Sequence, residues 1–292
     1  MSNPFDDKVV AITGAGKGLG RAYALYFATL GASVVVNNRR HEGESESSAD
    51  RVVAEIVGNG GSAVAEYSSV EDGQAGDNLL TVALNNFGRL DCLVANAGVS
   101  EGAPFRKQAL DDFRRVMEIN LMGTVNVVHP VFRYMCEAAG GTIVISTSSA
   151  GLFGEFGLPA YSTSKAAVIG LMRSLSLEGA PKSVHVNAIS PYATTQMTAD
   201  HLPAQIASQL EPEHVAPVVA WLASGSITGE IVIAGGGQAA RARLKTSSPV
   251  AVSANDAAGW RTLLASDACL EFGSAGRQFE DFAASLVTTN AT

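Results

Sequence analysis

Short apolar runs alternate with longer segments of helical period along most of the chain. The apolar runs are rich in β-branched residues, as expected for strands that are buried on both faces. They occupy residues 9–13, 32–37, 62–67, 91–96, 142–147, 184–190 and 230–235. The segments between them carry apolar residues at helical spacing, over 19–30, 47–58, 73–87, 111–138, 160–178 and 212–223. The pattern therefore predicts seven strands connected by helices.

This alternation is typical of a doubly wound α/β fold, because strand–helix–strand units form right-handed crossovers between parallel strands. We expect residues 1–237 to form one Rossmann-type domain, a seven-stranded parallel sheet with helices on both faces. The last part of the chain is different: the glycine-rich and basic stretch "GGGQAARARLKTSSP" (235–249) is followed by two short helical patterns. We expect residues 238–292 to form a C-terminal extension, acting as a lid or a dimerisation arm.

Composition and charge exclude several function classes. The chain of 292 residues has a net charge of -8, which would repel nucleic-acid phosphates, so we expect no nucleic-acid partner. Its apolar runs are far shorter than the ~20 residues of a membrane span, and its N-terminus does not resemble a signal peptide. We therefore expect a cytoplasmic protein without a membrane partner. Cys92, Cys136 and Cys269 lack metal-site or redox-pair spacing, which predicts free thiols and no metal site.

A glycine loop, "TGAGKGLG" (13–20), directly follows the first apolar run and leads into a helical segment. Glycines permit a sharp turn and a close backbone approach, and a helix N-terminus offers N–H groups to a pyrophosphate. The spacing is Gly14, Gly18 and Gly20, with Leu19 at the third glycine position of G-x-G-x-x-G. A structural turn is the alternative, but the strand–loop–helix context favours a dinucleotide site.

The end of the second predicted strand bears on the choice of nucleotide. Folds that bind NAD usually place an acidic residue there, against the ribose 2′-hydroxyl. This chain has Asn38, followed by Arg39 and Arg40, and Lys17 lies in the glycine loop. An asparagine does not repel a 2′-phosphate, and a guanidinium can bind one through two hydrogen bonds. The sequence thus predicts NADP as cofactor, with NAD possible; alternatively, the two arginines begin a solvated loop.

A tyrosine and a lysine stand four residues apart in "PAYSTSKAAV" (159–168), so Tyr161 and Lys165 share one helix face. Taken alone, this pair is more simply interpreted as a surface tyrosine beside a solvated lysine. Ser148 lies thirteen residues before Tyr161, "ANAG" (95–98) follows the fourth apolar run, and Asn120 lies in the long helical segment. With the glycine loop, these features resemble the classical short-chain dehydrogenase/reductase family over about residues 6–237.

Within this family, the segments "GRAYAL", "SVED", "SSAGLFGEFG" and "LEPEHVAPVVAWL" are most similar to the (3R)-hydroxyacyl-CoA dehydrogenase units of peroxisomal multifunctional enzymes. These units are also described as 17β-hydroxysteroid dehydrogenases, and they too carry a C-terminal extension. Their NAD preference is not carried over, because Asn38 replaces the aspartate on which it depends. Ala95 replaces the first asparagine of the usual "NNAG", and Tyr192 replaces a frequent glycine.

The resemblance implies the catalytic roles. Tyr161 is expected to protonate the substrate oxygen, which requires a phenol pKa below the ordinary ~10, and the ammonium of Lys165 is expected to lower it. Lys165 would also hold the nicotinamide ribose. Ser148 would bind the substrate oxygen, with Ser146 and Ser149 as rivals. Asn120 would anchor a water that relays protons to the lysine, or else would be a structural polar residue.

The resemblance also implies further cofactor contacts, after the third, fourth and sixth strands: Ser69, Val70, Asn96, Ala97, Gly98, Pro191, Tyr192 and Thr194. Residues 192–210 would then form the substrate loop. Its Met197, His201 and Leu202 are candidates for the pocket, although a packed amphipathic helix is the alternative.

The expected function is an NADP-linked reductase that interconverts a ketone and a secondary alcohol. By resemblance, 3-ketoacyl and 3-hydroxyacyl thioesters are the first substrate class, followed by steroids and small ketones. A non-catalytic protein that senses the dinucleotide is the alternative. The helical segments 111–138 and 160–178 match those that pair subunits in the family, so we expect a homodimer or homotetramer.

Overall fold

The computed structural model describes residues 5–40, 43–196, 204–250, 257–267 and 269–289. The chain divides into two compact units, Met1–Arg241 and Ala242–Thr292. The second unit contains helices α10 (Ala257–Leu264) and α11 (Ala275–Thr289), and an antiparallel bridge joins Thr246 to Leu270. No helix in these ranges is long and apolar enough to cross a membrane.

One sheet organises the first unit, with eight strands in the order β3-β2-β1-β4-β5-β6-β7-β8. The strands are β1 (Val9–Thr13), β2 (Ser33–Asn37), β3 (Ser62–Glu66), β4 (Cys92–Ala95), β5 (Gly141–Ser146), β6 (Val184–Pro191), β7 (Ile231–Gly235) and β8 (Gln238–Ala242). Every pairing from β3 to β7 is parallel. The predicted doubly wound fold is confirmed. Because the strand order reverses between β1 and β4, a crevice for ligands is expected at the carboxyl ends of these strands.

The predicted count of seven strands is one too low, because it omits β8. Only Gly236 and Gly237 separate β7 from β8, and so short a connection can join antiparallel but not parallel strands. Both glycines have positive φ, 56° and 73°, as a tight turn requires. The sequence of β8, "QAARA", is largely exposed and contains no apolar run, so the hydrophobic pattern did not reveal it.

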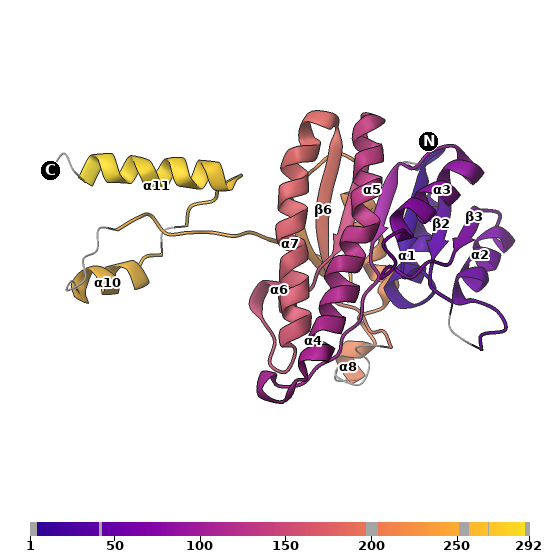
Figure 1. The fold of residues 1–292 in the computed structure, drawn as a ribbon, viewed down its shortest axis with the longest axis horizontal. Helices are drawn as coiled ribbons and strands as arrows, with labels where there is room; N and C mark the ends of the chain where they lie inside the picture. Colours follow the sequence, from indigo (N-terminus) through magenta and orange to yellow (C-terminus); the bar gives the residue numbers. More distant parts are fainter. Residues whose placement is uncertain (1–4, 41–42, 197–203, 251–256, 268, 290–292) are drawn as a thin grey trace. The chain divides into compact units, whose positions relative to one another are not determined.

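Helices connect the strands as expected, with two differences from the prediction. They are α1 (Gly18–Thr29), α2 (Ser48–Gly58), α3 (Ala75–Phe87), α4 (Leu110–Met117), α5 (Gly123–Glu137), α6 (Ser149–Phe153), α7 (Pro159–Gly179), α8 (Ala204–Ala207) and α9 (Ala216–Leu222). The single helix predicted over 111–138 is interrupted by a π-helical turn, Glu118–Met122, between α4 and α5. Among the short helices, α6 was not predicted, and α8 lies in the segment expected as the substrate loop, for which a helix was the alternative. Figure 1 shows α5 and α7 running alongside β6, which both helices contact.

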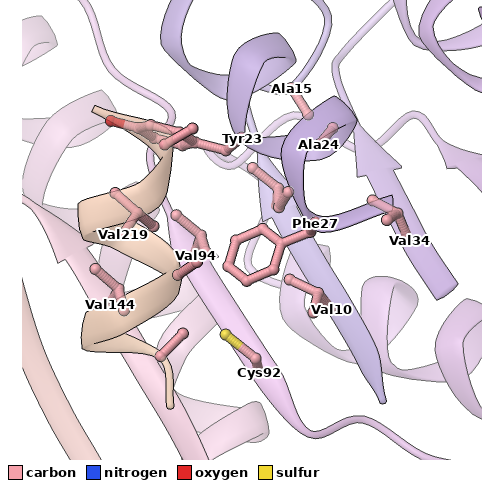
Figure 2. Packing of buried hydrophobic residues seen from close by; sticks show 14 of the residues in the cluster. Val10, Ala15, Tyr23, Ala24, Phe27, Val34, Cys92, Val94, Val144 and Val219 are labelled. Atoms are coloured by element: carbon pink, nitrogen blue, oxygen red, sulfur yellow. The ribbon is translucent and has the colours of Figure 1, made fainter. Parts of the chain in front are cut away.

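A hydrophobic core fixes the strands whose ends carry the polar residues. Figure 2 shows Phe27 of α1 between Val10 of β1 and Val94 of β4, with Val144 of β5 and Val219 of α9 on the far side of Val94. All of these side chains are buried. Burial of each such side chain contributes about 1.5–3 kcal/mol. The strand ends beyond this core are therefore rigid supports for a binding site.

Candidate active site

A cavity of about 340 Å³ lies beyond the carboxyl ends of β1, β2 and β4. Most of the predicted cofactor residues line it: Gly14, Lys17, Gly18, Leu19, Gly20, Asn38, Arg39, Ser69, Val70, Asn96, Ala97 and Gly98. Residues that the sequence interpretation missed also line it: Asn37, Ser68, Glu71, Val99, Ile119, Thr195 and Gln196. The cavity thus joins six separate segments of the sequence at the point where the strand order reverses.

The glycine loop is built for a ligand that approaches the backbone. Gly14 and Gly18 have φ values of +65° and +51°, and a Cβ on Gly20 would lie 2.3 Å from the carbonyl oxygen of Gly14. Lys17 is the N-cap of α1, and its side chain makes no capping hydrogen bond. The first N–H groups of α1 are therefore not capped by that side chain, and together with the helix dipole they suit a pyrophosphate. The residues present fit a nicotinamide dinucleotide.

The loop after β4 is attached to the end of β1. Thr13 Oγ1 accepts hydrogen bonds of 3.0 Å from the backbone N–H groups of both Asn96 and Ala97. The side chain of Asn96 donates to the carbonyl of Thr13 over 3.1 Å. A Cβ on Gly14 would meet Ala97 Cα at 3.0 Å, so the two loops pack closely. Asn96 therefore holds the loop to β1. Position 95, where Ala95 replaces the usual asparagine, takes no part in these hydrogen bonds.

The two arginines after β2 have different surroundings. Asn38 Nδ2 donates to Ser48 Oγ over 2.8 Å, which fixes the neutral side chain beside the glycine loop, and Arg39 lines the cavity. Arg40 instead stacks on Tyr67, with its guanidinium carbon 4.2 Å from the ring centroid, and lies 3.7 Å from Asp50. Of the two arginines, only Arg39 is among the residues that line the cavity.

A buried carboxylate supports the side of the cavity next to β3. Glu66 accepts hydrogen bonds from Asn37 Nδ2 at 2.5 Å and from the backbone N–H and hydroxyl of Ser68 at 2.9 and 2.6 Å. Asn37 also donates to the carbonyl of Ser68 over 3.0 Å. Two of the missed lining residues are therefore fixed by one carboxylate. The signal was present in the sequence, since Asn37 is the polar residue that ends the second predicted strand and Ser68 directly follows the third.

The predicted catalytic residues converge at the end of β5. Tyr161 lies in the first turn of α7, which begins with Pro159, and Lys165 follows one turn later. Ser148, just after β5, lies close enough to the Tyr161 hydroxyl to lower its pKa. Lys165 Nζ donates to the carbonyl of Ser146 over 2.9 Å and lies 5.8 Å from the Tyr161 ring centroid. A phenol, a hydroxyl and an ammonium thus form one cluster.

Burial sets the protonation of this cluster. It raises the pKa of Tyr161 above its ordinary value, and the hydrogen bond with Ser148 lowers that pKa in part. The direction is opposite to the lowered pKa that the sequence predicted from the charge of Lys165, because desolvation outweighs the other effects. Burial lowers the pKa of Lys165 to about 8, since an ammonium loses hydration when it is enclosed.

Asn120 lies in the π-helical turn and is fully buried. Its Oδ1 accepts from the backbone N–H of Val99 over 2.8 Å, and its Nδ2 donates to the Val99 carbonyl over 2.9 Å. Nδ2 also donates to Ser164 Oγ over 3.1 Å. The side chain therefore holds the loop after β4 against α7. Its backbone carbonyl accepts from Thr124 Oγ1 over 2.7 Å, so one lone pair of that carbonyl is used.

The segment after β6 differs in detail from the sequence interpretation. Thr194 Oγ1 donates to the carbonyl of Ala207 over 2.8 Å, and it is the next residue, Thr195, that lines the cavity beside Gly18. Pro191 and Tyr192 are not among the lining residues, and Tyr192 is 46% exposed. Tyr161 and Lys165 lie outside the cavity lining as well. The substrate candidates Met197, His201 and Leu202 lie outside the described residues.

Comparisons with known proteins agree with this geometry. The family model for short chain dehydrogenases matches residues 8–206. A short-chain type dehydrogenase/reductase of Mycobacterium tuberculosis is 42% identical over 246 residues, which are 82% of this chain and 85% of that protein. Peroxisomal multifunctional enzyme type 2 of Mus musculus is 42% identical over 228 residues, and the match covers 76% of this chain but only 31% of that enzyme.

Solved structures show the same relationship. The full-length peroxisomal multifunctional enzyme type 2 of Drosophila melanogaster superposes with a TM-score of 0.82 at 29% identity, covering 97% of this chain and 50% of that one. A short chain dehydrogenase from Mycobacterium avium gives a TM-score of 0.80 at 33% identity, covering 89% and 96%. The chain belongs to the short-chain dehydrogenase family, whose members are NAD(P)-dependent oxidoreductases that act on CH–OH groups.

Proposed function

We propose that this enzyme is an NADP-linked reductase that interconverts 3-ketoacyl and 3-hydroxyacyl thioesters. The observation that supports a ketone–alcohol reaction is the cluster of Tyr161, Ser148 and Lys165 at the end of β5. The nucleotide cavity extends to Gly98 and Val99, and the side chain of Asn120 hydrogen-bonds both backbone groups of Val99. Gly98 also approaches Lys165, whose Nζ would lie 3.4 Å from a Cβ placed on that glycine.

In the proposed mechanism, a bound nicotinamide nucleotide supplies the hydride. The Tyr161 hydroxyl donates its proton to the oxygen of the reduced carbonyl, and its raised pKa keeps this proton in place until the oxygen becomes basic. Ser148 Oγ accepts the backbone N–H of Ala150 over 3.2 Å, and its own proton would turn from Tyr161 to the substrate oxygen. A hydroxyl donor fixed in this way stabilises the charge that develops on that oxygen.

Lys165 and Asn120 support these steps. One of the three ammonium protons of Lys165 is donated to Ser146, and the other two can reach the nucleotide ribose or a water that resupplies Tyr161. The side chain of Asn120 is occupied by Val99 and Ser164. We therefore assign the Asn120 side chain a positioning role, and a relay water at this residue would not be held by that side chain.

The preference for NADP is supported by the charges around the cavity. Lys17 and Arg39 both line it, whereas no carboxylate stands at position 38, and the Asn38 amide is directed to Ser48. Two cations can neutralise a 2′-phosphate, and hydrogen bonds to charged groups contribute about 1.5–3 kcal/mol each. Arg40 is excluded from this role by its contacts with Tyr67 and Asp50.

The substrate class is supported by the relatives. A 3-oxoacyl-[acyl-carrier-protein] reductase of Synechocystis is 36% identical over 242 residues, or 79% of this chain and 96% of that protein. Together with the peroxisomal enzymes, this relative favours a 3-ketoacyl thioester. A second class, small cyclic or steroid ketones, is favoured by a cyclohexanol dehydrogenase of Acinetobacter that is 35% identical over 232 residues.

The test is a carbonyl panel that contains a 3-ketoacyl-CoA, a steroid ketone and cyclohexanone, each with NADPH and NADH. The highest kcat/KM is expected for the 3-ketoacyl-CoA with NADPH. A higher kcat/KM for the steroid ketone or for cyclohexanone would overturn the proposed substrate class and favour that ketone instead. A clear NADH preference would overturn the cofactor proposal. The proposed homodimer or homotetramer can be checked separately by measuring the mass of the protein in solution.

A further inference from the structure

Three consecutive residues at the end of β5 contact the catalytic residues of α7. The carbonyl of Ser146 accepts from Lys165 Nζ over 2.9 Å, and the hydroxyl of Thr147 donates to the backbone carbonyl of Lys165 over 2.7 Å. Ser148 lies beside the phenol of Tyr161 and lowers its pKa. Adjacent residues thus hold Lys165 at both its ammonium and its backbone. Thr147 is only 2% exposed, and its N–H donates to the carbonyl of Ile189 in β6.

A second buried hydroxyl makes the equivalent contact at the tyrosine. Ser164 Oγ donates to the backbone carbonyl of Tyr161 over 2.8 Å and accepts from Asn120 Nδ2 over 3.1 Å. Its exposed fraction is 0%. Ser164 therefore ties the tyrosine backbone to the π-helical turn, as Thr147 ties the lysine backbone to the sheet.

These two bonds are not needed to satisfy the helix. A carbonyl inside an α-helix already accepts the N–H four residues later, so a hydroxyl takes only its second lone pair. Close approach at the same place adds to this: a Cβ on Gly151 of α6 would lie 2.5 Å from the carbonyl carbon of Lys165. Thr147 and α6 thus contact the backbone of residues 161–165 directly, and the π-helical turn is linked to it through the Ser164 hydroxyl.

We propose that Thr147 and Ser164 are positioning residues, which fix the reacting side chains of Lys165 and Tyr161 by holding their backbone carbonyls. Neither hydroxyl is assigned a contact with substrate or nucleotide. The inference rests on the catalytic roles proposed above for Tyr161 and Lys165. Because a displacement of about 1 Å in an active site can lower a rate about 100-fold, loss of either bond is expected to affect the chemical step more than binding.

The test uses Thr147→Val and Ser164→Ala, each with a matched control. Thr142→Val is the control on the same strand, since Thr142 is buried and donates to the carbonyl of Ala223 over 3.1 Å. Ser176→Ala is the control on α7, since Ser176 is buried and donates to the carbonyl three residues earlier, Arg173, over 2.8 Å. Each control removes a hydrogen bond from a buried hydroxyl to a backbone carbonyl, but at a carbonyl outside residues 161–165.

Two readouts are measured. The first is kcat and the KM for NADPH, with whichever ketone the wild type reduces fastest. The second needs no substrate: the ¹³Cζ signals of the six tyrosines are followed against pH, and the Tyr161 signal is identified by its absence in Tyr161→Phe. We expect kcat to fall at least tenfold in Thr147→Val and in Ser164→Ala, with KM within about threefold and a displaced Tyr161 titration. Thr147→Ser should restore both readouts.

The controls should keep the kcat and the Tyr161 titration of the wild type. The proposal is overturned if Thr147→Val and Ser164→Ala keep the wild-type kcat and Tyr161 titration. It is also overturned if kcat falls as much in the two controls as in these two variants. If Thr147→Val does not fold, Thr147→Ala takes its place beside Ser164→Ala. Failure of the proposed function is seen separately, because a wild type that reduces no 3-ketoacyl-CoA still gives the tyrosine titration.

Discussion

Lys165 and Ser146 are joined by a hydrogen bond of 2.9 Å between the lysine ammonium and a backbone carbonyl. Lys165 is only 5% exposed, and this is the one hydrogen bond of its ammonium within the described part of the chain. A buried cation with so little compensation has a pKa lowered to about 8. Because it is buried beside Tyr161, the ammonium therefore reduces the stability of the fold.

Replacing this lysine should stabilise the protein below pH 8. A cation whose pKa is lowered from 10.5 to about 8 binds fewer protons in the folded state, so the unfolding free energy rises with pH between those values. Lys165→Met removes this dependence. Chemical denaturation should show the variant as more stable than wild type at pH 7, with the difference shrinking at pH 9. An equal difference at both pH values would contradict the proposed burial cost.

Alanine substitutions of the two arginines after β2 should differ in their effect on kcat/KM for NADPH. Arg39→Ala is expected to lower kcat/KM for NADPH about 10- to 100-fold while leaving that for NADH within about threefold, because it removes one charged hydrogen-bond donor to the 2′-phosphate. Arg40→Ala should change both values by a similar small factor, since Arg40 contacts Tyr67 and Asp50 instead. A larger NADPH-specific loss in Arg40→Ala would assign the phosphate to Arg40.

The glycine loop makes a steric prediction. Gly20→Ala places a Cβ 2.3 Å from the Gly14 carbonyl oxygen, so the cradle must distort, and nucleotide affinity should fall at least tenfold. Gly170→Ala is the control, because Gly170 is exposed in α7 with no atom near its missing Cβ. It should keep wild-type affinity and raise the unfolding free energy by up to about 1 kcal/mol. Fluorescence titration with NADPH distinguishes the two variants.

The sheet could be predicted because its strands are buried on both faces and read as continuous apolar runs. The strand β8 could not, since "QAARA" forms at an exposed edge and is specified by the glycine turn before it. The π-helical turn at Asn120 was also missed, because one extra residue hardly changes the hydrophobic period over 111–138. This turn carries Asn120, whose side chain hydrogen-bonds both the N–H and the carbonyl of Val99.

The site was predicted best where a residue's role depends on its own backbone position. The glycines of the loop and Asn38 line the cavity as expected. Roles that depend on neighbours could not be read from the sequence. Arg40 contacts Tyr67 and Asp50, which come from separate segments of the chain. Whether Thr194 or Thr195 lines the cavity depends on which of the two side chains faces Ala207.

The most direct measurement is the rate of NADPH oxidation with a 3-ketoacyl-CoA, for wild type and Tyr161→Phe, with NADPH affinity determined in parallel. Wild type should turn over, and Tyr161→Phe should be at least about 100-fold slower with unchanged NADPH affinity, because only the acidic proton is lost. Wild-type turnover in Tyr161→Phe would contradict the account.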